Sequence, residues 1–221
     1  MVSDLAIVIQ GESKYVELLK SAFKGYNVIF STWHGEESKY SSNDKVIYNT
    51  LPKGKFGEYI FGPCNLNLQK ISTINGLLLA KKLGFKKALK IRSDLIPNNT
   101  SDFLNLLNND HLNFLCWHGH EVYPNCSGYL VDFLMSGNID DLLNIWDIED
   151  MSWCVVPEIF LTSNVINKYK DINNINYILN NITEANDLFW IKNNKNLSSF
   201  NKQWIYSLTK EHLKPDYLKF L

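Results

Sequence analysis

Three side chains capable of chemistry stand side by side at positions 92–94, at the end of an apolar stretch. Leu89 and Ile91 alternate with charged residues as in a half-buried strand, and Arg92, Ser93 and Asp94 complete the segment. Carboxylate oxygens suit Mg²⁺ and Mn²⁺, and a guanidinium can bind phosphate with two parallel hydrogen bonds. The triplet therefore indicates either a cation and phosphate site or a surface ion pair between Arg92 and Asp94 of little energetic consequence.

Polar residues also follow two other predicted strands. Gln10 and Gly11 come at the end of an apolar run at 5–10, and Thr32 lies near the end of a second run at 27–33. In mostly parallel sheets, ligands bind outside the carboxyl ends of the strands, so we expect these clusters to converge on one rim. Gly11 would either supply a turn or let backbone amides approach a nucleotide, although the dinucleotide-binding pattern GxGxxG is absent.

Strand and helix signals alternate along the first half of the chain. We predict strands at 5–10, 27–33, 45–49 and 87–92, and helices at 13–24 and 68–83, the second ending at Gly84. This alternation favours an α/β fold with a central, mostly parallel (mixed) sheet flanked by helices and a Rossmann-like N-terminal half. No linker is visible, so we expect a single domain over 1–221, divided into a ligand-binding half (1–97) and a second half (98–221).

The predicted helix at 68–83 has two distinct faces. Its apolar residues at helical spacing predict a core-facing stripe of Ile71, Ile74 and Leu78. Its polar or small residues form a separate face, made of Gln69, Ser72, Thr73 and Gly76. A glycine inside a helix costs up to about 1 kcal/mol relative to alanine, so Gly76 indicates a close approach, either of a ligand or of the sheet.

Two acidic residues of the second half are candidates for proton transfer. Asp132 lies inside an apolar strand-like segment at 129–135, so its carboxyl must be paired, as a structural anchor or as a perturbed functional group. Glu158 follows Pro157 in the first turn of a predicted helix at 157–169, where the helix dipole favours an anion. Glu158 could accept a proton there, or simply follow the ordinary preference for acids at a helix start.

The composition excludes several classes of protein. The chain carries 22 Lys and Arg against 23 Asp and Glu, a net charge of -1, which argues against nucleic acid as a partner. No apolar run approaches the ~18 residues that span a bilayer, so we expect no transmembrane segment, although peripheral membrane association stays open. The four cysteines show no paired or zinc-binding spacing, which suits reduced thiols in a cytoplasmic protein.

Taken in order, several segments resemble the WavE family of lipopolysaccharide-synthesis proteins, which belong with the GT-A type glycosyltransferases. The similar segments span residues 4 to 170: 4–11, 31–33, 67–69 with 72–73 and 76–77, 90–94, 132–137 with 140–142 and Trp146, and 157–158. The resemblance implies a single GT-A-like domain that transfers a sugar from a nucleotide-sugar donor to a glycan or lipopolysaccharide-type acceptor.

The resemblance also implies roles for particular residues. Asp94 would be the metal-facing carboxylate of an Asp-x-Asp motif, holding Mn²⁺ or Mg²⁺. Arg92 stands where the motif has its first aspartate, so it could take over part of the charge neutralisation. The catalytic base would be Glu158, ahead of Asp132. The nucleotide-sugar would be bound by Gln10, Gly11, Thr32, Gln69, Thr73, Arg92, Ser93 and Asp94.

Two other classes of function remain open. A metal-dependent nucleotidyl or phosphoryl transferase also needs carboxylates at strand ends, although usually at least two of them. A domain that binds a nucleotide or a glycan without turnover is the other, since 13% of the residues are aromatic and six are tryptophan. Aromatic rings stack on sugars, but they also fill protein cores.

Overall fold

The computed structural model describes residues 4–51, 58–59, 62–63, 66–107, 112–116, 130–148, 161, 164, 183–184, 188–193, 196–199 and 204–207. Its α-helices are α1 (Val16–Ala22), α2 (Leu66–Lys82), α3 (Thr100–Leu107) and α4 (Ile139–Trp146), and two 3₁₀ turns cover Ser13–Tyr15 and Glu37–Lys39. The strands of the first half are β1 (Leu5–Gln10), β2 (Asn27–Trp33), β3 (Val46–Asn49), β4 (Glu58–Tyr59), β5 (Gly62–Pro63), β6 (Lys87–Arg92) and β7 (Leu95–Pro97). Those of the second half are β8 (Asn113–Cys116), β9 (Leu130–Asn138), β10 (Thr183–Glu184), β11 (Leu188–Asn193), β12 (Asn196–Ser199) and β13 (Trp204–Ser207).

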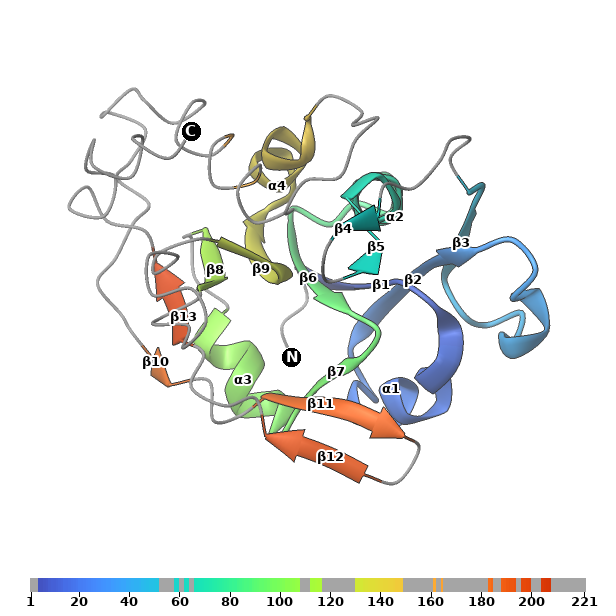
Figure 1. Ribbon diagram of the computed structural model, residues 1–221, viewed down its shortest axis with the longest axis horizontal. Coiled ribbons are helices and arrows are strands. Elements are labelled where there is room, and N and C mark those ends of the chain that lie inside the picture. The colour runs from blue at the N-terminus through green and yellow to red at the C-terminus, as the bar shows by residue number, and fades with distance from the viewer. Residues whose placement is uncertain are drawn as a thin grey trace.

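The main sheet has eight strands in the order β10-β13-β8-β9-β6-β1-β2-β3. The strands β3, β2, β1 and β6 are parallel, whereas β9, β8, β13 and β10 continue the sheet by antiparallel pairing. The predicted α/β fold with a mixed central sheet is confirmed, and its N-terminal half has the Rossmann-like alternation of parallel strands and helices (Figure 1).

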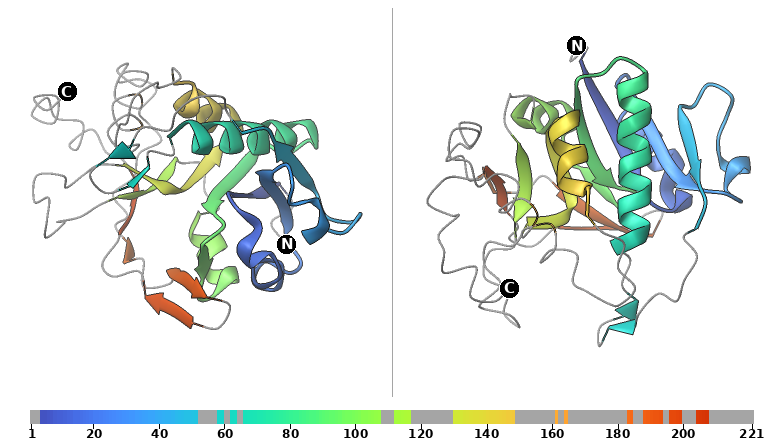
Figure 2. Two further views of the ribbon diagram at one scale, coloured as in Figure 1. Left: turned by 45° about the vertical axis from the view of Figure 1, so that its right-hand side comes forward. Right: turned by 90° about the horizontal axis from the view of Figure 1, so that it is seen from above.

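Helices cover both faces of this sheet. One core cluster joins Leu5, Ile7 and Ile9 of β1 to α1 and α3, and a second joins Ala6 and Val8 to α2 and α4. Every residue of β1 is therefore buried, as expected for a parallel strand that is covered on both faces. Figure 2 shows α2 and α4 side by side along one face of the sheet.

The orientation of α2 differs from the prediction. The buried residues of α2 are Leu66, Gln69, Ser72, Thr73, Gly76, Leu77 and Ala80, so its polar and small face lies against the sheet. The predicted core stripe was wrong: Leu78 is 48% exposed, and Ile71 and Ile74 are only half-buried. A Cβ at position 76 would collide with Val8 Cγ1 and lie 3.1 Å from Ser31 Cβ, so Gly76 serves close helix–sheet packing.

Hydrogen bonds explain why α2 turns polar side chains inward. Ser31 Oγ donates to the Ser72 carbonyl oxygen at 2.5 Å, and Ser72 Oγ donates to Gln10 Oε1 at 2.8 Å. Asn49 Nδ2 donates in turn to Ser31 Oγ at 3.0 Å. These buried polar groups therefore satisfy one another's hydrogen bonds, and the polar face of α2 can pack against the sheet. Hydrophobic periodicity alone would predict that this face is exposed to solvent.

The helix α2 ends in the predicted glycine turn. Gly84 has a φ of +91°, which favours glycine, and its N–H donates to the Lys81 carbonyl oxygen at 3.0 Å. The N–H of Phe85 donates to the Ala80 carbonyl oxygen at 3.2 Å, which satisfies another carbonyl group of the last turn. The chain then enters β6, which carries the triplet at 92–94 to the edge of the sheet.

Several other predicted boundaries shift by a few residues. The predicted helix at 13–24 begins as a 3₁₀ turn and becomes α1 only at Val16. The strand that carries Asp132 extends to Asn138, whose side chain accepts a hydrogen bond from the Asp140 N–H at 2.9 Å and so begins α4. The predicted helix at 157–169 lies outside the described residues except for Leu161 and Asn164. Within the described ranges, every helix is too short or too polar to cross a membrane.

Candidate functional site

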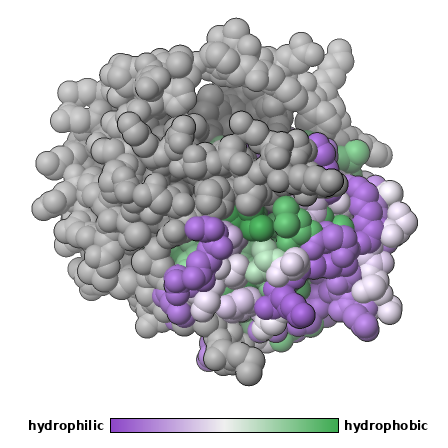
Figure 3. Space-filling view, turned by 90° about the horizontal axis from the view of Figure 1, so that it is seen from below, coloured by the Kyte–Doolittle hydropathy of each residue, from purple (hydrophilic) through white to green (hydrophobic). Residues whose placement is uncertain are grey.

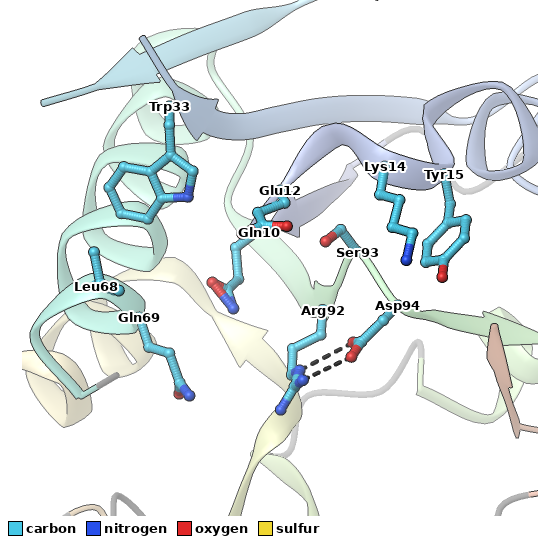
Figure 4. Close-up of a pocket in the computed structure, with 11 residues that line it drawn as sticks. Gln10, Glu12, Lys14, Tyr15, Trp33, Leu68, Gln69, Arg92, Ser93 and Asp94 are labelled. Carbon is cyan, nitrogen blue, oxygen red and sulfur yellow. Dashed lines mark hydrogen bonds and ion pairs between the residues drawn. The ribbon is translucent and has the colours of Figure 1, made fainter. Parts of the chain in front are cut away.

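A pocket of about 370 Å³ opens at the carboxyl ends of β1, β2 and β6, beside the first turn of α2 (Figure 4). The residues that line it are Gln10, Gly11, Glu12, Lys14, Tyr15, Trp33, Leu68, Gln69, Arg92, Ser93 and Asp94. Six of the eight residues predicted to bind a nucleotide-sugar are among them. Thr32 and Thr73 are the two that do not line this pocket.

Strand register brings the first loop against the triplet. Gln10 pairs with Arg92 on one side and with Ser31 on the other, so the ends of β6, β1 and β2 lie level. The Ser93 N–H donates to the Gln10 carbonyl oxygen at 2.9 Å, and the Gly11 N–H donates to the Ser31 carbonyl oxygen at 3.1 Å. These bonds fix the backbone of the pocket floor.

Gly11 is required by the geometry of this floor. Its φ is +121°, a conformation that side-chain-bearing residues rarely adopt, and a Cβ there would lie 2.8 Å from Ser93 Oγ. The turn that the sequence offered as one reason for Gly11 is therefore present, together with a close approach to Ser93. The other reason, an approach of backbone amides to a nucleotide, stays a prediction.

Arg92 and Asp94 form an ion pair inside the pocket. Arg92 Nε donates to Asp94 Oδ1 at 3.0 Å and Nη2 donates to Oδ2 at 2.6 Å, so both carboxylate oxygens are engaged (Figure 4). The Arg92 guanidinium also lies 4.6 Å from the ring centroid of Phe133. With side chains 26% and 31% exposed, the pair is accessible to a ligand. The triplet therefore forms the ion pair of one interpretation, and this pair lines a pocket, where the other interpretation expects a cation and a phosphate.

Five lining residues were not among the predicted binding residues: Glu12, Lys14, Tyr15, Trp33 and Leu68. Lys14 lies near the Tyr15 ring, 5.2 Å from its centroid, and its ammonium adds a second cation to the pocket. Glu12, Lys14 and Tyr15 follow Gly11 within four positions. The rule that ligands bind at the carboxyl ends of parallel strands would have indicated these three residues if it had been applied to the turn after β1 as well. The same rule applies to Trp33, which is the last residue of β2.

The two ends of the pocket differ in chemistry. Trp33 and Leu68 lie at one end, and Lys14, Ser93 and Asp94 lie at the other, with Gln10 between them (Figure 4). Trp33 and Leu68 offer apolar surface, whereas the other end carries opposite charges. A ligand with one aromatic part and one anionic part would match this division.

Two polar atoms of α2 near this pocket are buried without a hydrogen-bond partner in the described part of the chain. They are Gln69 Oε1 and Thr73 Oγ1, and the Gln69 side chain is only 7% exposed although it lines the pocket. An unsatisfied buried acceptor costs roughly 1–3 kcal/mol, so Gln69 is a candidate to gain a partner from a ligand. Thr73 is fully buried one turn further along α2.

Thr32 belongs to a hydrogen-bonded cluster that ties the first loop to the second. Thr32 Oγ1 lies 2.8 Å from Ser13 Oγ and donates to Glu36 Oε2. The Ser13 N–H donates to both Glu36 oxygens at 3.1 Å, and Ser13 Oγ lies 2.5 Å from the Tyr40 hydroxyl. We call Ser13, Thr32, Glu36 and Tyr40 the loop clamp. Thr32 thus supports the loop that carries Lys14.

The loop clamp holds Glu36 as a carboxylate. Burial alone would raise the pKa of Glu36, but hydrogen bonds from Lys39, Thr32 and Ser13 outweigh it and lower the pKa to about 2. Burial raises the pKa of Tyr40 to about 12, with the Glu36 charge acting in the same direction. At neutral pH the clamp is therefore one anion surrounded by donors.

Asp132 is buried behind the pocket. It is 1% exposed, and its carbonyl oxygen accepts a hydrogen bond from the fully buried ammonium of Lys90, which lies 5.1 Å from the Trp146 ring centroid. Burial raises the pKa of Asp132, while the charges of Lys90 and Arg92 act against that rise. Asp132 does not line the pocket, and its Oδ2 is buried without a hydrogen-bond partner in the described part of the chain, so its role stays a prediction. Glu158 lies outside the described residues, so its role stays a prediction.

The lining would give a divalent cation a complete shell only if a bound phosphate added oxygens to it. The part of the chain that the structure describes holds no group of three or more His, Cys, Asp or Glu side chains arranged for a metal. Magnesium sites often use one or two carboxylates, and phosphate and water oxygens complete the shell. Asp94 and Glu12 are the two carboxylates of this pocket, and Asp94 would first have to part from Arg92.

A scan against protein-family models finds no match, and a search of curated proteins finds none either. Among solved structures, a cytidylyltransferase from Leptospira borgpetersenii serovar Hardjo-bovis (strain JB197) is similar, with a TM-score of 0.40 and 10% sequence identity. The alignment covers 77% of this chain and 73% of that chain. This likeness concerns the course of the backbone and says nothing about the side chains of the pocket. The resemblance to the WavE family stays a prediction.

Proposed function

We propose that the pocket binds the phosphates of an activated nucleotide and that the protein transfers a group from this donor. One observation carries the proposal: Arg92 and Asp94 meet Gly11 and Ser93 in a single pocket at the carboxyl ends of three parallel strands. A guanidinium binds phosphate oxygens with two hydrogen bonds, and a glycine loop lets the backbone come close to them.

Within this proposal the two ends of the pocket bind different parts of the donor. The base packs on Trp33 and Leu68. The unsatisfied Oε1 of Gln69 accepts a hydrogen bond from a donor group of the base or ribose. The phosphates lie toward Lys14 and Arg92. The lining carries two cations, Lys14 and Arg92, against two anions, Glu12 and Asp94, so a divalent cation at Asp94 would supply the remaining positive charge.

Glycosyl transfer to a glycan acceptor is the first reaction that this site suits. The step needs a stabilised diphosphate leaving group and, for inversion, a carboxylate that takes the proton from the acceptor hydroxyl. Arg92 and Lys14 serve the leaving group, and a bound Mg²⁺ or Mn²⁺ adds Lewis-acid stabilisation. Glu158 is our proposed base. If Glu158→Gln keeps nearly the wild-type rate where Asp94→Asn is inactive, that assignment is wrong.

Nucleotidyl transfer is a second candidate, and the described pocket lining favours it in one respect. Its carboxylates are Asp94, which Arg92 engages, and Glu12, which is exposed, while Asp132 lies buried behind. None of these is well placed as a general base. A phosphate nucleophile is already ionised and needs no base, so Lys14 and Arg92 would suffice to orient a triphosphate for attack on its α-phosphorus.

Product analysis separates these reactions. The chain is incubated with Mn²⁺ and either nucleotide-sugars plus glycan acceptors, or nucleoside triphosphates plus sugar phosphates. Release of nucleoside diphosphate supports glycosyl transfer, and release of pyrophosphate supports nucleotidyl transfer. Both activities should be lost in Asp94→Asn and kept in Glu17→Gln, which changes an exposed carboxylate on α1. Thermal stabilisation by oligosaccharide alone, with no turnover and none by any nucleotide, would overturn the proposal in favour of a glycan-binding domain.

A further inference from the structure

The outward side of α2 combines exposed leucine and lysine side chains. Because α2 turns its polar and small residues toward the sheet, Leu78 and the half-buried Ile71 point away from it, whereas Ile74 packs against the core at the side of the helix. Leu78 is 48% exposed, and Leu83 in the following turn is 46% exposed. Figure 2 shows this helix running along the outside of the molecule, with α4 beside it on the sheet.

Exposed hydrophobic residues gather around this helix. In the part of the chain that the structure describes, the large apolar side chains that are exposed are Leu51, Leu78 and Leu83. Leu51 follows β3, whose Asn49 accepts a hydrogen bond from Asn75 of α2 at 2.8 Å. Leu78 and Leu83 thus lie on and directly after α2, and Leu51 follows the strand whose end is bonded to this helix. On the opposite face, the coloured part of Figure 3 shows mostly hydrophilic residues around a smaller hydrophobic area.

Positive charge gathers at the C-terminal end of the same helix. Four lysines occur within residues 81–87, in a chain with a net charge of -1. Lys82 and Lys86 are exposed, and Lys81 is partly neutralised by Asp140 at 2.5 Å. Lys45 adds a further ammonium, 5.6 Å from the ring centroid of Phe85. The turn at 83–85 thus presents apolar side chains between cations.

We propose that the outward face of α2 and the turn at 83–85 bind the surface of an anionic lipid bilayer. Exposed leucines beside exposed lysines match the two layers of a membrane interface, because Leu78 and Leu83 can enter the acyl-chain region while Lys82 and Lys86 contact anionic headgroups. A purely apolar partner would leave the charges of Lys82 and Lys86 without counterions. The charge complementarity therefore selects an anionic surface as the occupant.

Docking in this way sets the orientation of the pocket. Leu68 and Gln69 in the first turn of α2 line the pocket, whereas Leu83 follows its last turn. With α2 lying along the bilayer, the pocket opens beside the membrane surface. A substrate held in the membrane would then reach it without leaving the bilayer. The inference concerns surface binding and holds whichever reaction the pocket performs.

Vesicle sedimentation tests the proposal with the full chain. At low salt, the protein should sediment with vesicles of phosphatidylcholine and phosphatidylglycerol in a 7:3 ratio and stay in solution with phosphatidylcholine alone. A lysine near an anionic surface contributes about fivefold in partitioning, so Lys82→Glu with Lys86→Glu should lower partitioning at least about 25-fold. Lys24→Glu makes the charge change of one of these two substitutions at an exposed position after α1, on the other face, and should leave partitioning unchanged.

The apolar part has its own test. Leu78→Gln with Leu83→Gln keeps every charge and should also reduce partitioning, while circular dichroism and the thermal midpoint show that the fold is retained. Equal sedimentation with neutral vesicles, or unchanged partitioning of both double variants, would overturn the proposal. So would a wild-type dimer in analytical ultracentrifugation that the leucine variant dissociates, because α2 would then pack against a second copy of the chain.

Discussion

Arg92 and Asp94 neutralise each other across two hydrogen bonds, of 3.0 Å from Nε to Oδ1 and 2.6 Å from Nη2 to Oδ2. A divalent cation would need the same two oxygens, so the guanidinium and the cation compete for one carboxylate. A phosphate resolves this competition, because it attracts the guanidinium away from Asp94 and offers oxygens to the cation. The pair therefore couples cation binding to donor binding.

Replacing Arg92 should strengthen cation binding. A partly exposed ion pair contributes up to about 1 kcal/mol, so Arg92→Gln should tighten Mn²⁺ binding by up to about fivefold, as measured by isothermal titration calorimetry. Asp94→Asn should abolish this binding. Lys14→Gln removes the other cation of the pocket, whose ammonium lies over the Tyr15 ring, and serves as the control. Weaker Mn²⁺ binding in Arg92→Gln than in Lys14→Gln would contradict the competition.

Gly11→Ala should destabilise the fold for two separable reasons. The positive φ of Gly11 costs roughly 1–3 kcal/mol for a residue with a side chain, and the new Cβ would press on Ser93 Oγ at 2.8 Å. Gly25→Ala shares the first cost, since Gly25 has a φ of +87°, but meets no atom within 4 Å. Urea denaturation should therefore show a larger loss of unfolding free energy for Gly11→Ala than for Gly25→Ala.

A second variant tests the contact itself. Ser93→Gly removes the hydroxyl that the new Cβ would meet, so it should recover part of the stability lost in Gly11→Ala. Purely additive losses in the double variant would show that the Ser93 contact contributes nothing.

Glu36 should make the stability of the chain depend on acid. The pKa of Glu36 is lowered from 4.5 to about 2, so its carboxylate stabilises the folded state above its unfolded pKa. That contribution is lost as the pH falls through the range between these two values. Glu36→Gln should lower the free energy of unfolding at pH 7 by about 1–3 kcal/mol and flatten its decline toward low pH.

The control for this variant is Glu17→Gln, at a side chain that is 80% exposed. Urea denaturation measured in steps between pH 7 and pH 3 compares the two variants with the wild type. A Glu36→Gln profile that falls as steeply as the wild-type profile would show that the loop clamp does not hold a carboxylate of low pKa.

Lys90→Met should be strongly destabilising. Burial raises the pKa of the Asp132 carboxyl, and the fully buried Lys90 ammonium, which donates to the Asp132 carbonyl oxygen, opposes that rise. Removing one charge of a buried pair costs about 3–5 kcal/mol, because the other is left uncompensated. The pKa of Asp132 should rise further, so the loss of stability relative to wild type should be larger at pH 7 than at pH 4.

A double-mutant cycle measures this coupling. Lys90→Met combined with Asp132→Asn should lose less stability than the sum of the single variants, as measured by chemical denaturation. If the two losses add within about 0.5 kcal/mol, the residues act independently.

Much of this arrangement could be predicted from local patterns. The alternating apolar runs predict β1, β2 and β6, and the parallel-sheet rule brings Gln10, Gly11 and Arg92 to one edge, because side-chain periodicity and strand direction are properties of the sequence itself. The charged triplet was recognisable because polar residues rarely interrupt a buried strand without a reason.

The remaining features depend on contacts between distant segments. Lys90 reads as the exposed half of an alternating strand, yet it is fully buried because Asp132 and Trp146 receive its ammonium. The inward face of α2 depends on Ser31 of β2 and Gln10 of β1, which are distant in sequence but in direct contact with the helix. Hydrophobic periodicity shows which face of a helix is polar. It does not show that the sheet carries polar side chains that can hydrogen-bond to that face.

The loop clamp has a consequence for the thermodynamics of binding. Ser13, Thr32, Glu36 and Tyr40 hold the loop with Lys14 before any ligand arrives. That wall of the pocket therefore gives up little configurational freedom when a ligand binds, whereas Arg92 must exchange a partner. The free energy of ligand binding should therefore contain only a small entropic cost of ordering this loop. A larger contribution should come from the enthalpy of separating Arg92 from Asp94.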